Sequence, residues 1–376
     1  MGRNWTEIAD KIIRKEEKVA ARNKGKIPYT AKDHVFDDRS DKKDICWWTN
    51  GFYGGMMWQL FGATGNELFK ECAVKLEEQM DAAFLNYNGM DHDAGFRWLP
   101  TAVANYRLFA GEEAKNRGLL AAASLAGRFN LNGNFIRAWN DWGDDRDTTG
   151  WAIIDCMMNL PLLYWASKEL GDPRFKEIAI AHANTAQDYF IREDGSVRHI
   201  VGFDPVTGEF DREYGGQGYG EGSSWTRGQT WALYGFTLSF IHTGDRNYLE
   251  TAMKVADRFC DRIPEDGLIP VDFDQPKEPS YIDSTAAAIA SCGLITLAKE
   301  LEKIGEAGSD RYLEAAEKML SALDEKDCDY DPEHDELLTR CSASYHDKNH
   351  EFPIIYGDYY YIEAIWKLTD KELFIW

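Results

Sequence analysis

Gly65–Glu71, with the sequence GNELFKE, is one copy of a short phrase that recurs along this chain of 376 residues. The related stretches are GEEAKN from Gly111, GDPRFKE from Gly171, GDRNYLE from Gly244, GSDRYLE from Gly308 and TDKELF from Thr369, of which the first and last are the weakest copies. Between Gly65 and Gly308 the mean spacing is about 61 residues. Glycine commonly ends a helix, Asp, Asn or Ser caps the next one, and an aromatic side chain holds the new helix against its neighbour. The phrase therefore predicts a repeated junction between two helices.

The stretches on the two sides of the phrase differ in their hydrophobic pattern. Before most copies the chain is apolar nearly all round, as in Gly51–Gly65 (GFYGGMMWQLFGATG), Trp151–Leu170 (WAIIDCMMNLPLLYWASKEL), Trp231–Gly244 (WALYGFTLSFIHTG) and Ser284–Leu301 (STAAAIASCGLITLAKEL). After the copies it has one apolar stripe and one charged face, as in Phe69–Met80 and Tyr248–Cys260. A helix that is apolar on all sides is buried, whereas an amphipathic helix lies at the surface. Each repeat therefore predicts an inner helix, a short turn and an outer helix.

Repetition of this hairpin predicts the architecture. At about 61 residues per repeat the chain holds roughly six hairpins. Six inner helices closed into a ring and wrapped by six outer ones form an all-α (α/α)6 barrel, which we expect as a single domain over residues 1–376, with residues 1–43 as an N-terminal helix and lead-in. Strand signals are confined to 196–203 and 268–273, which we interpret as hairpin pieces in loops. Ordinary helix capping produces a similar repeat, so the repeat alone does not require a closed ring.

Charge and composition exclude several classes of protein. Asp and Glu number 64 against 42 Lys and Arg, which gives a net charge of −22, and such a surface repels a phosphate backbone. No apolar run reaches the roughly 18 residues of a membrane span, and the first 18 residues are charged and amphipathic rather than a signal peptide. The seven cysteines are scattered without a CxxC pair, which argues against disulfides and cysteine-bound zinc. We expect a cytoplasmic protein that binds neither nucleic acid nor membranes.

Asp155 is an acid in unusually apolar surroundings. It is the only charged residue between Thr148 and Ser167, and Asn159 follows one helical turn later on the same face. A buried ionised carboxylate is costly unless something in its surroundings compensates it. A catalytic acid near the mouth of the ring and an acid stabilised by the helix dipole in the first turn fit this position equally well.

Three further acids stand close to the predicted inner helices. Asp93 lies among aromatic residues in MDHDAGFRW, next to Asp91 and His92, and Asp283 and Asp358 each precede a buried helix. An Asx-turn or a helix N-cap explains each position without any catalytic role. From position alone we favour that structural interpretation.

Arg227 is the only charged residue between Glu221 and His242. Its guanidinium is suited to pair with the carboxylate of a substrate, and a buried salt bridge to one of the acids explains it equally well. His199 lies in a candidate loop, where a lone histidine is more often structural than a ligand. No HExxH, P-loop or strand-linked GxGxxG motif occurs, so neither a metal nor a nucleotide cofactor is expected.

Six blocks of the sequence resemble glycoside hydrolase family 88, the unsaturated glucuronyl hydrolases. The blocks are WWTNGF (Trp47–Phe52), HDAGF (His92–Phe96), IIDCMMNLPLLYWAS (Ile153–Ser167), SSWTRGQTWALYG (Ser223–Gly235), DSTAAAIASCGL (Asp283–Leu294) and YGDYYYIEAI (Tyr356–Ile365). They occur in the same order as in the family, and the likeness runs from about Asp44 to Trp366. The fold of the family is an (α/α)6 barrel, which agrees with the repeat.

The resemblance implies an unusual glycosidase chemistry. The substrate is an oligosaccharide left by a polysaccharide lyase, with a C4=C5 unsaturated uronic acid at its non-reducing end. This double bond is an enol ether, because C5 also carries the ring oxygen. Protonation of C4 gives an oxocarbenium ion at C5, water adds there, and the resulting hemiketal opens and releases the neighbouring sugar. One carboxylic acid can donate the proton and then take one from the water, provided that apolar surroundings keep it protonated near neutral pH.

The resemblance also assigns residues. By similarity, Asp155 matches the general acid/base of the family, and Asp93 matches a second essential acid that holds the ring hydroxyls. The matched substrate-binding positions are Trp48, His199, Gln217, Trp225, Arg227 and Trp231. Gly216 departs from the family, because a well-known member has histidine just before the glutamine of the glycine-rich loop Tyr214–Gly222. This departure bears on the contacts to the second sugar and therefore on linkage preference.

Several functions stay open at this point. The residue blocks favour an unsaturated glucuronyl hydrolase acting on oligosaccharides of glycosaminoglycan type, while the sister activity on unsaturated rhamnogalacturonyl fragments of pectin uses the same fold and proton chemistry. A sugar epimerase on this barrel needs a pair of histidines, here His92 and His199, and a non-catalytic helical scaffold leaves Asp155 without a role. The expected partners are di- and oligosaccharides that carry an unsaturated uronate, and we expect a monomer or weak oligomer without a cofactor.

Overall fold

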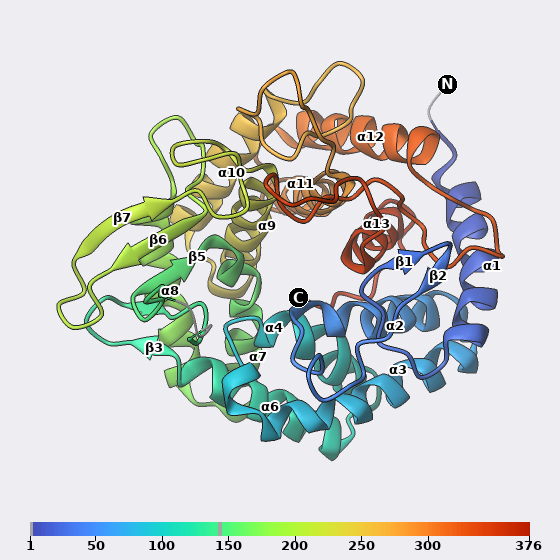
Figure 1. The fold of residues 1–376 in the computed structure, drawn as a ribbon, viewed down its shortest axis with the longest axis horizontal. Coiled ribbons are helices and arrows are strands. Elements are labelled where there is room, and N and C mark those ends of the chain that lie inside the picture. The colour runs from blue at the N-terminus through green and yellow to red at the C-terminus, as the bar shows by residue number, and fades with distance from the viewer. Residues whose placement is uncertain (1–2, 142–144) are drawn as a thin grey trace.

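Hairpins of inner and outer helices form a closed ring in the computed structural model, which describes residues 3–141 and 145–376 (Figure 1). The inner helices are α2 (Phe52–Thr64), α4 (Ala94–Trp98) continued by a π-helical turn (Leu99–Val103) and α5 (Ala104–Phe109), α7 (Leu160–Leu170), α9 (Thr226–Thr243), α11 (Ser284–Ile304) and α13 (Ile355–Leu368). The outer helices are α1 (Trp5–Asn23), α3 (Glu67–Gln79), α6 (Glu112–Ala126), α8 (Pro173–Phe190), α10 (Arg246–Cys260) and α12 (Ser309–Lys326). Because α13 packs against both α11 and α2, the ring closes, and the expected all-α (α/α)6 barrel is confirmed.

The sixth outer helix comes from the N-terminal end of the chain. Helix α1 packs against α13 and α3, so the predicted N-terminal helix is the outer partner of the last inner helix. The weak copy of the phrase at Thr369 does not begin a helix, since the chain after Leu368 is irregular. That part of the repeat prediction is wrong, and the first and last segments of the chain meet at one seam of the ring.

The recurring phrase has the predicted local structure at its strong copies. The glycines that end α2, α7 and α9 have positive φ, and the next residue accepts a hydrogen bond from the backbone N–H two positions on; these pairs are Gly65 and Asn66, Gly171 and Asp172, and Gly244 and Asp245. At the fourth strong copy the roles separate, because Gly305 ends α11 and Gly308 precedes α12. Left-handed backbone suits glycine, which has no Cβ.

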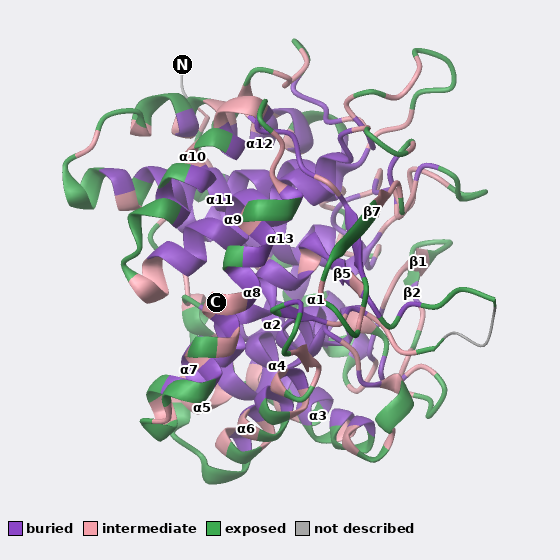
Figure 2. Ribbon diagram, turned by 90° about the vertical axis from the view of Figure 1, so that its left-hand side faces the viewer, coloured by how far each residue is buried: buried purple, intermediate pink, exposed green. Residues whose placement is uncertain are grey.

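Burial separates the two layers of the ring (Figure 2). Every residue from Thr226 to Phe240 in α9 and from Ser284 to Ala298 in α11 is buried. The outer helix α10 buries one stripe, which includes Tyr248, Ala252 and Phe259. A charged side chain within the inner layer therefore needs a partner or a use.

The strands are short and belong to the connections between helices. They are β1 (Ala31–Lys32) paired with β2 (Val35–Phe36), β3 (Phe129–Asn130) paired with β4 (Phe135–Ile136), and the antiparallel sheet β5 (Trp151–Ile153), β6 (Ile200–Phe203) and β7 (Phe210–Tyr214), in that order. The strand signal at 196–203 is confirmed in part by β6. The signal at 268–273 forms only isolated bridges, such as Trp225 with Asp272. Within residues 3–141 and 145–376, none of the helices has the length and apolar character needed to cross a bilayer.

Candidate active site

A cavity of about 760 Å³ lies among the loops that lead into the inner helices. Four of the eight predicted catalytic and substrate-binding residues line it, namely Trp48, Asp93, His199 and Gln217. They come from the turn before α2, the turn before α4, the residue before β6 and the glycine-rich loop after β7. The ring closure therefore brings together side chains that are up to 169 positions apart in the chain.

Asp155 lies beside His199, with 3.9 Å between Asp155 Oδ1 and His199 Nε2. It belongs to a 3-10 turn, Ile154–Met158, that connects β5 to α7, and the inner helix itself begins only at Leu160. The side chain of Asp155 is 13% exposed, and its Oδ1 has no hydrogen-bond partner among the described residues. Burial raises its pKa to about 7, with His92 acting against the shift and Asp93 adding to it. A large share of this carboxyl is therefore protonated at neutral pH.

His199 is a neutral ring that presents a proton toward Asp155. The backbone N–H of Gln217 donates to His199 Nδ1 at 3.0 Å, a shorter contact than the 3.3 Å between Nδ1 and the carbonyl of Gly215. Because an amide N–H can only donate, Nδ1 accepts, and the ring proton lies on Nε2. Burial lowers the pKa of His199 to about 3. The ring of Trp225 packs on His199 with 4.0 Å between the centroids.

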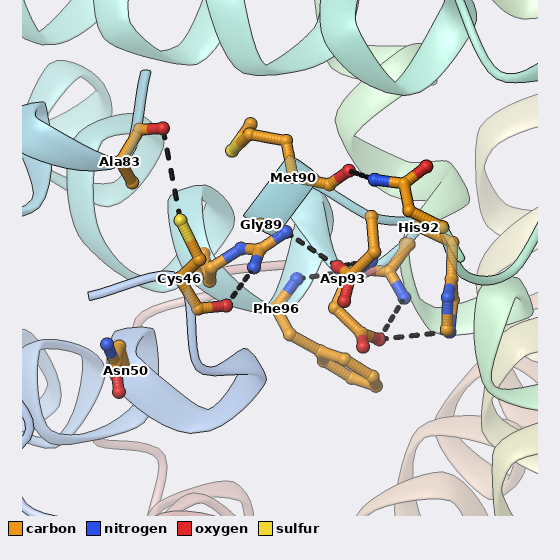
Figure 3. A network of polar contacts seen from close by, with 12 residues as sticks. Cys46, Asn50, Ala83, Gly89, Met90, His92, Asp93 and Phe96 are labelled. Carbon is orange, nitrogen blue, oxygen red and sulfur yellow. Dashed lines mark hydrogen bonds and ion pairs between the residues drawn. The ribbon is translucent and has the colours of Figure 1, made fainter. Parts of the chain in front are cut away.

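Asp93 differs from Asp155 in its protonation state, because its pKa is lowered rather than raised. Its Oδ1 lies 3.1 Å from Nε2 of His92 and accepts a hydrogen bond from Asn159 Nδ2 at 3.4 Å (Figure 3). Burial by itself raises the pKa of Asp93, but His92, Arg97 and Asn159 outweigh it, and the pKa lies below its ordinary value. Burial likewise disfavours a charged His92, yet Asp93 and the carbonyl of Ala138 raise its pKa. We therefore assign an ionised Asp93 paired with a protonated His92.

Asn159 connects the two acids. Its Nδ2 also donates to the backbone carbonyl of Asp155 at 3.3 Å, and its Oδ1 accepts from the backbone N–H of Phe96 at 2.8 Å. This fully buried amide thereby joins the turn before α4 to the turn before α7. The sequence placed Asn159 on the same face as Asp155 but did not predict its bond to Asp93.

The turn that contains Asp93 is also held by a buried arginine, Arg97. Arg97 donates to Asp91 Oδ1 at 2.7 Å and to the carbonyl of Cys46. Asp91 Oδ1 in turn accepts from the backbone N–H of Asp93 at 3.0 Å. Figure 3 shows Cys46 and Asp93 approaching this network from separate segments of the chain.

Arg227 forms a buried salt bridge with an acid, which is one of the two explanations that its sequence position left open. It is buried and donates to Asp283 Oδ2 at 2.7 Å, to the carbonyl of Ser342 at 2.8 Å and to the carbonyl of Ala343. Asp283 also caps α11 by accepting from the backbone N–H of Thr285 at 3.1 Å, as predicted. Arg227 is not among the residues that line the cavity.

The glycine-rich loop and the segment after Cys341 hold each other in place. Gln217 Nε2 donates to the carbonyl of Ala343 at 2.9 Å, and the backbone N–H of Tyr345 donates to the carbonyl of Gln217 at 2.9 Å. Gly216 has φ of +57°, and a Cβ at this position would lie 2.2 Å from His199 Nδ1. The loop in this conformation therefore has no room for a side chain at position 216.

Two of the expected aromatic contacts lie deeper than the cavity wall. Trp231 is fully buried in α9 and packs against Phe96 and Tyr360, with ring centroids 5.1 and 5.7 Å away. Trp225 is 2% exposed beneath His199.

The N-cap interpretation of Asp358 is wrong. This residue lies inside α13, and its Oδ1 accepts a hydrogen bond from the backbone N–H of Leu338 in the segment before the helix.

Sequence reasoning missed an aromatic part of the cavity wall. Trp139, Trp151 and Tyr214 line it, and the rings of Trp151 and Tyr214 lie 4.4 Å apart. Trp151 comes from β5 and Tyr214 from β7, which both pair with β6. Only their sheet brings them together, so the sequence pattern held no signal beyond their aromatic character.

The barrel, the buried acid and the aromatic cavity define a carbohydrate-active enzyme, and comparison with known proteins identifies its family. The chain matches the family Glycosyl Hydrolase Family 88 over residues 11–373. It is 37% identical over 340 residues to an unsaturated glucuronyl hydrolase of Bacillus sp. (strain GL1), covering 89% of this chain and 88% of the relative. It is 33% identical to an unsaturated chondroitin disaccharide hydrolase of Streptococcus pneumoniae (strain ATCC BAA-255 / R6), covering 96% and 90%.

A solved structure gives the same result. An aspartate-to-asparagine variant of an unsaturated glucuronyl hydrolase with dGlcA-Glc-Rha-Glc superposes with a TM-score of 0.90, at 33% identity and 97% coverage of both chains. The chain belongs to glycoside hydrolase family 88. The resemblance seen in the six sequence blocks is thereby confirmed, and the protein is a glycosidase.

Proposed function

We propose that this enzyme releases the unsaturated glucuronic acid from the non-reducing end of lyase-generated oligosaccharides by hydration of its C4=C5 bond. The observation that carries the proposal is Asp155, a buried carboxyl whose pKa is raised to about 7 and whose Oδ1 has no partner among the described residues. Such a group can act first as an acid and then as a base at neutral pH. Membership of family 88 supports the same reaction.

The proposed steps use one carboxyl group. Asp155 transfers its proton to C4, and the electron pair of the double bond forms the new C–H bond, which leaves an oxocarbenium ion at C5. Water attacks C5 while the Asp155 carboxylate takes one of its protons, which restores the acid and gives a hemiketal. Opening of the hemiketal breaks the bond between C5 and the ring oxygen, which gives a ketone at C5 and a hemiacetal at C1. The hemiacetal then collapses to an aldehyde at C1, and the neighbouring sugar leaves as an alcohol. These steps balance without a metal or a cofactor.

The other site residues receive supporting roles. The ionised Asp93 accepts hydrogen bonds from ring hydroxyls, and Nε2–H of His199 donates toward Asp155 or the substrate. Trp48 and Gln217 line the cavity where the sugars lie. Arg227 acts through the segment that it holds, Ser342–Ala343, and its positive charge also lowers the pKa of Asp155 slightly against the effect of burial.

Substrates of glycosaminoglycan type fit the comparisons, because the relatives are named for unsaturated glucuronyl and chondroitin disaccharide substrates. A short oligosaccharide fits the net charge of −22 better than a long polyanion. A histidine-pair epimerase is disfavoured, since both ring nitrogens of His92 are engaged and Nδ1 of His199 accepts from Gln217.

The test is the loss of ultraviolet absorbance by the conjugated C4=C5 carboxylate. We expect loss with unsaturated chondroitin, hyaluronan or heparin disaccharides and none with an unsaturated rhamnogalacturonan disaccharide, using the Asp155→Asn variant as the inactive control. Loss with the pectin fragment alone contradicts the glucuronyl assignment and favours the sister activity. No loss with any of them contradicts the proposed reaction.

We also propose that residues 1–376 act as one catalytic domain, because α1 and α13 complete the same ring. The seven cysteines are all unpaired, which supports the proposal of a cytoplasmic, reducing location. The expectation of a monomer or weak oligomer stays a prediction.

A further inference from the structure

A second cavity, of about 400 Å³, adjoins the cavity that holds the acids. Trp151 and Tyr214 line both of them, so the two cavities meet at this aromatic pair. The remaining walls of the second cavity come from the segment before β5 and from the hairpin of β6 and β7. Its volume lies within the range of about 300–1,000 Å³ that is usual for small-molecule sites. The second cavity is therefore large enough for a further sugar.

The register of the sheet explains why the two cavities share these rings. Trp151 pairs with Gly202, and Tyr214 pairs with Ile200, two positions before Gly202. Paired residues and alternate residues of a strand project from the same face of a sheet, so both rings flank Gly202 on one face. A Cβ at Gly202 would lie 3.0 Å from Cε2 of Tyr214. This face therefore carries two rings beside a bare stretch of backbone, which a ligand can approach closely.

Aromatic rings also connect the acids to the second cavity. The ring centroids of His92 and Trp139 are 5.9 Å apart, those of Trp139 and Trp151 are 6.3 Å apart, and those of Trp151 and Tyr214 are 4.4 Å apart. His92 is itself paired with Asp93. An oligosaccharide whose first ring lies beside Asp93 therefore has a continuous aromatic wall on which the apolar faces of its next sugars can pack.

The second cavity is acidic. Four carboxylates line it, and no lysine or arginine does so within the part of the chain that the structure describes; the four are Asp147, Asp204, Glu209 and Asp211. Hydrogen bonds from Thr149 lower the pKa of Asp147, and the charge of Arg137 adds to this shift. Arg212 lies 3.8 Å from Asp211 and 5.1 Å from the centre of the Tyr214 ring. Two cations beside four carboxylates leave an excess of negative charge, which opposes the entry of an anion.

The spacing of these carboxylates suits a sugar better than a metal ion. Among the described residues, no three of the four offer oxygens that lie within 4.8 Å of one another, whereas a bound cation needs several ligands at one point. Separate carboxylates beside aromatic rings can each accept a hydrogen bond from a sugar hydroxyl. The lining therefore matches an uncharged ligand that is rich in hydroxyl groups.

We propose that the second cavity binds the third sugar of the oligosaccharide, and that it accepts a neutral sugar and disfavours one that carries a carboxylate or a sulfate. The inference rests on the proposed function, which places the unsaturated ring beside Asp93 and Asp155. Uronate and hexosamine alternate in glycosaminoglycan fragments, so their third sugar is a uronate. Glycosaminoglycan substrates are thereby restricted to disaccharides, while a chain with a neutral third sugar gains contacts as it lengthens.

The test measures Kd by calorimetry, with the Asp155→Asn variant to prevent turnover. One pair of probes is the unsaturated disaccharide and tetrasaccharide of hyaluronan, in which the third sugar is glucuronate. The other pair is dGlcA-Glc and dGlcA-Glc-Rha-Glc, in which the third sugar is the neutral rhamnose; the solved relative holds this tetrasaccharide. We expect the tetrasaccharide to bind more tightly than its disaccharide in the neutral pair and less tightly in the hyaluronan pair. Added salt should narrow the hyaluronan difference, because exposed charges are screened.

The double variant Glu209→Gln/Asp211→Asn removes two of the charges, and both residues are exposed, so the fold should be kept. In the Asp155→Asn background it should improve the binding of the hyaluronan tetrasaccharide, relative to its disaccharide, by about 2–10-fold, the scale of two exposed charge interactions. Glu302→Gln/Glu314→Gln is the matched control, because it removes two exposed charges from α11 and α12. This control should leave the ratio of the two Kd values unchanged.

Three results would overturn the proposal. The neutral tetrasaccharide could bind no more tightly than its disaccharide, the hyaluronan tetrasaccharide could gain as much as the neutral one, or the charge variant could leave the hyaluronan ratio unchanged. Hydrolysis of both disaccharides by the wild-type enzyme is followed separately through the loss of ultraviolet absorbance. Since Kd does not depend on turnover, a failure of the proposed reaction and a failure of the third-sugar cavity give different results.

Discussion

Asp155 and Asp93 show how the same side chain acquires two charge states within one site. Asp155 Oδ1 has no hydrogen-bond partner in the described part of the chain, and burial raises the pKa of this carboxyl to about 7. Asp93 is also buried, but His92, Arg97 and Asn159 stabilise its ionised form. When the pKa values of two neighbouring acids shift in opposite directions, one acid can donate a proton while the other stays an anion. The roles that we propose, hydroxyl binding by Asp93 and proton transfer by Asp155, both depend on this separation.

Replacement of Asp155 by Asn removes the transferable proton. We expect kcat to fall by about 10²–10⁴-fold, while Tm changes little. In the wild type, kcat should decline as pH rises through about 7, since only the protonated carboxyl can donate to C4. Asp172→Asn is the matched control, because Asn also caps a helix. Retention of substantial activity by the Asp155 variant would contradict the mechanism.

Replacement of Arg227 by Ala leaves Asp283 buried without its cation. Removal of one partner of a buried pair costs about 3–5 kcal/mol, so we expect a matching loss in the free energy of unfolding, measured with urea. Arg246→Ala breaks an exposed pair with Glu306 and should change that free energy by no more than about 1 kcal/mol. A raised KM with unchanged stability would instead assign Arg227 to the substrate carboxylate.

At the scale of elements, the helices follow local rules and the loops that build the site do not. Three strong copies of the phrase end one helix on glycine and cap the next with Asn or Asp, as local hydrogen bonding predicts. The glycine-rich loop is positioned by distant partners, because Asp272 accepts from the backbone of Tyr219 and the hydroxyl of Ser223. Its position relative to His199 is therefore a property of the folded ring.

In the glycine-rich loop, substitution of Gly216 and of Gly220 should affect activity differently. Gly216→Ala places a Cβ at positive φ, 2.2 Å from His199 Nδ1, so it displaces His199 from Asp155. We expect kcat/KM to fall by up to about 10²-fold, the scale of a displacement of about 1 Å. In Gly220→Ala, in the same loop, the new Cβ meets no atom of residues 3–141 or 145–376 within 4 Å, so this variant should retain activity. Equal kcat/KM values for the two variants would show that the loop tolerates a side chain at 216.

At the scale of the whole molecule, ring closure by α1 creates a buried acidic contact. Glu16 on α1 is fully buried, and burial raises its pKa to about 8, with Lys15 and Arg22 acting against the shift and Asp358 and Asp335 adding to it. Burial also raises the pKa of Asp358 on α13 to about 7. The seam between the ends of the chain therefore holds two carboxyls, Glu16 and Asp358, that are mostly protonated in the folded state below about pH 7.

This seam predicts how stability depends on pH. Between pH of about 4.5 and 8, Glu16 binds a proton in the folded state but not in the unfolded state, so stability falls as pH rises through this window. We expect Glu16→Gln to flatten the decline by a few kcal/mol, since each pKa unit is worth about 1.4 kcal/mol. Urea unfolding at pH 5 and pH 8 measures it, with the exposed neighbour in Glu17→Gln as control. Identical slopes for wild type and Glu16→Gln would contradict a protonated Glu16.

The amino-acid sequence by itself determined the hairpins, their inner and outer faces and the family, because capping, amphipathicity and motif order are local properties. Asp155 stood out as a lone charge in an apolar stretch, and the N-cap at Asp283 followed from its place before a helix. Tertiary structure alone decided the rest: α1 as the sixth outer helix, the bond from Arg227 to Asp283, and the meeting of Trp151 with Tyr214. Each depends on segments tens to hundreds of residues apart, and the opposite pKa shifts of Asp93 and Asp155 depend on burial and neighbours that exist only in the closed ring.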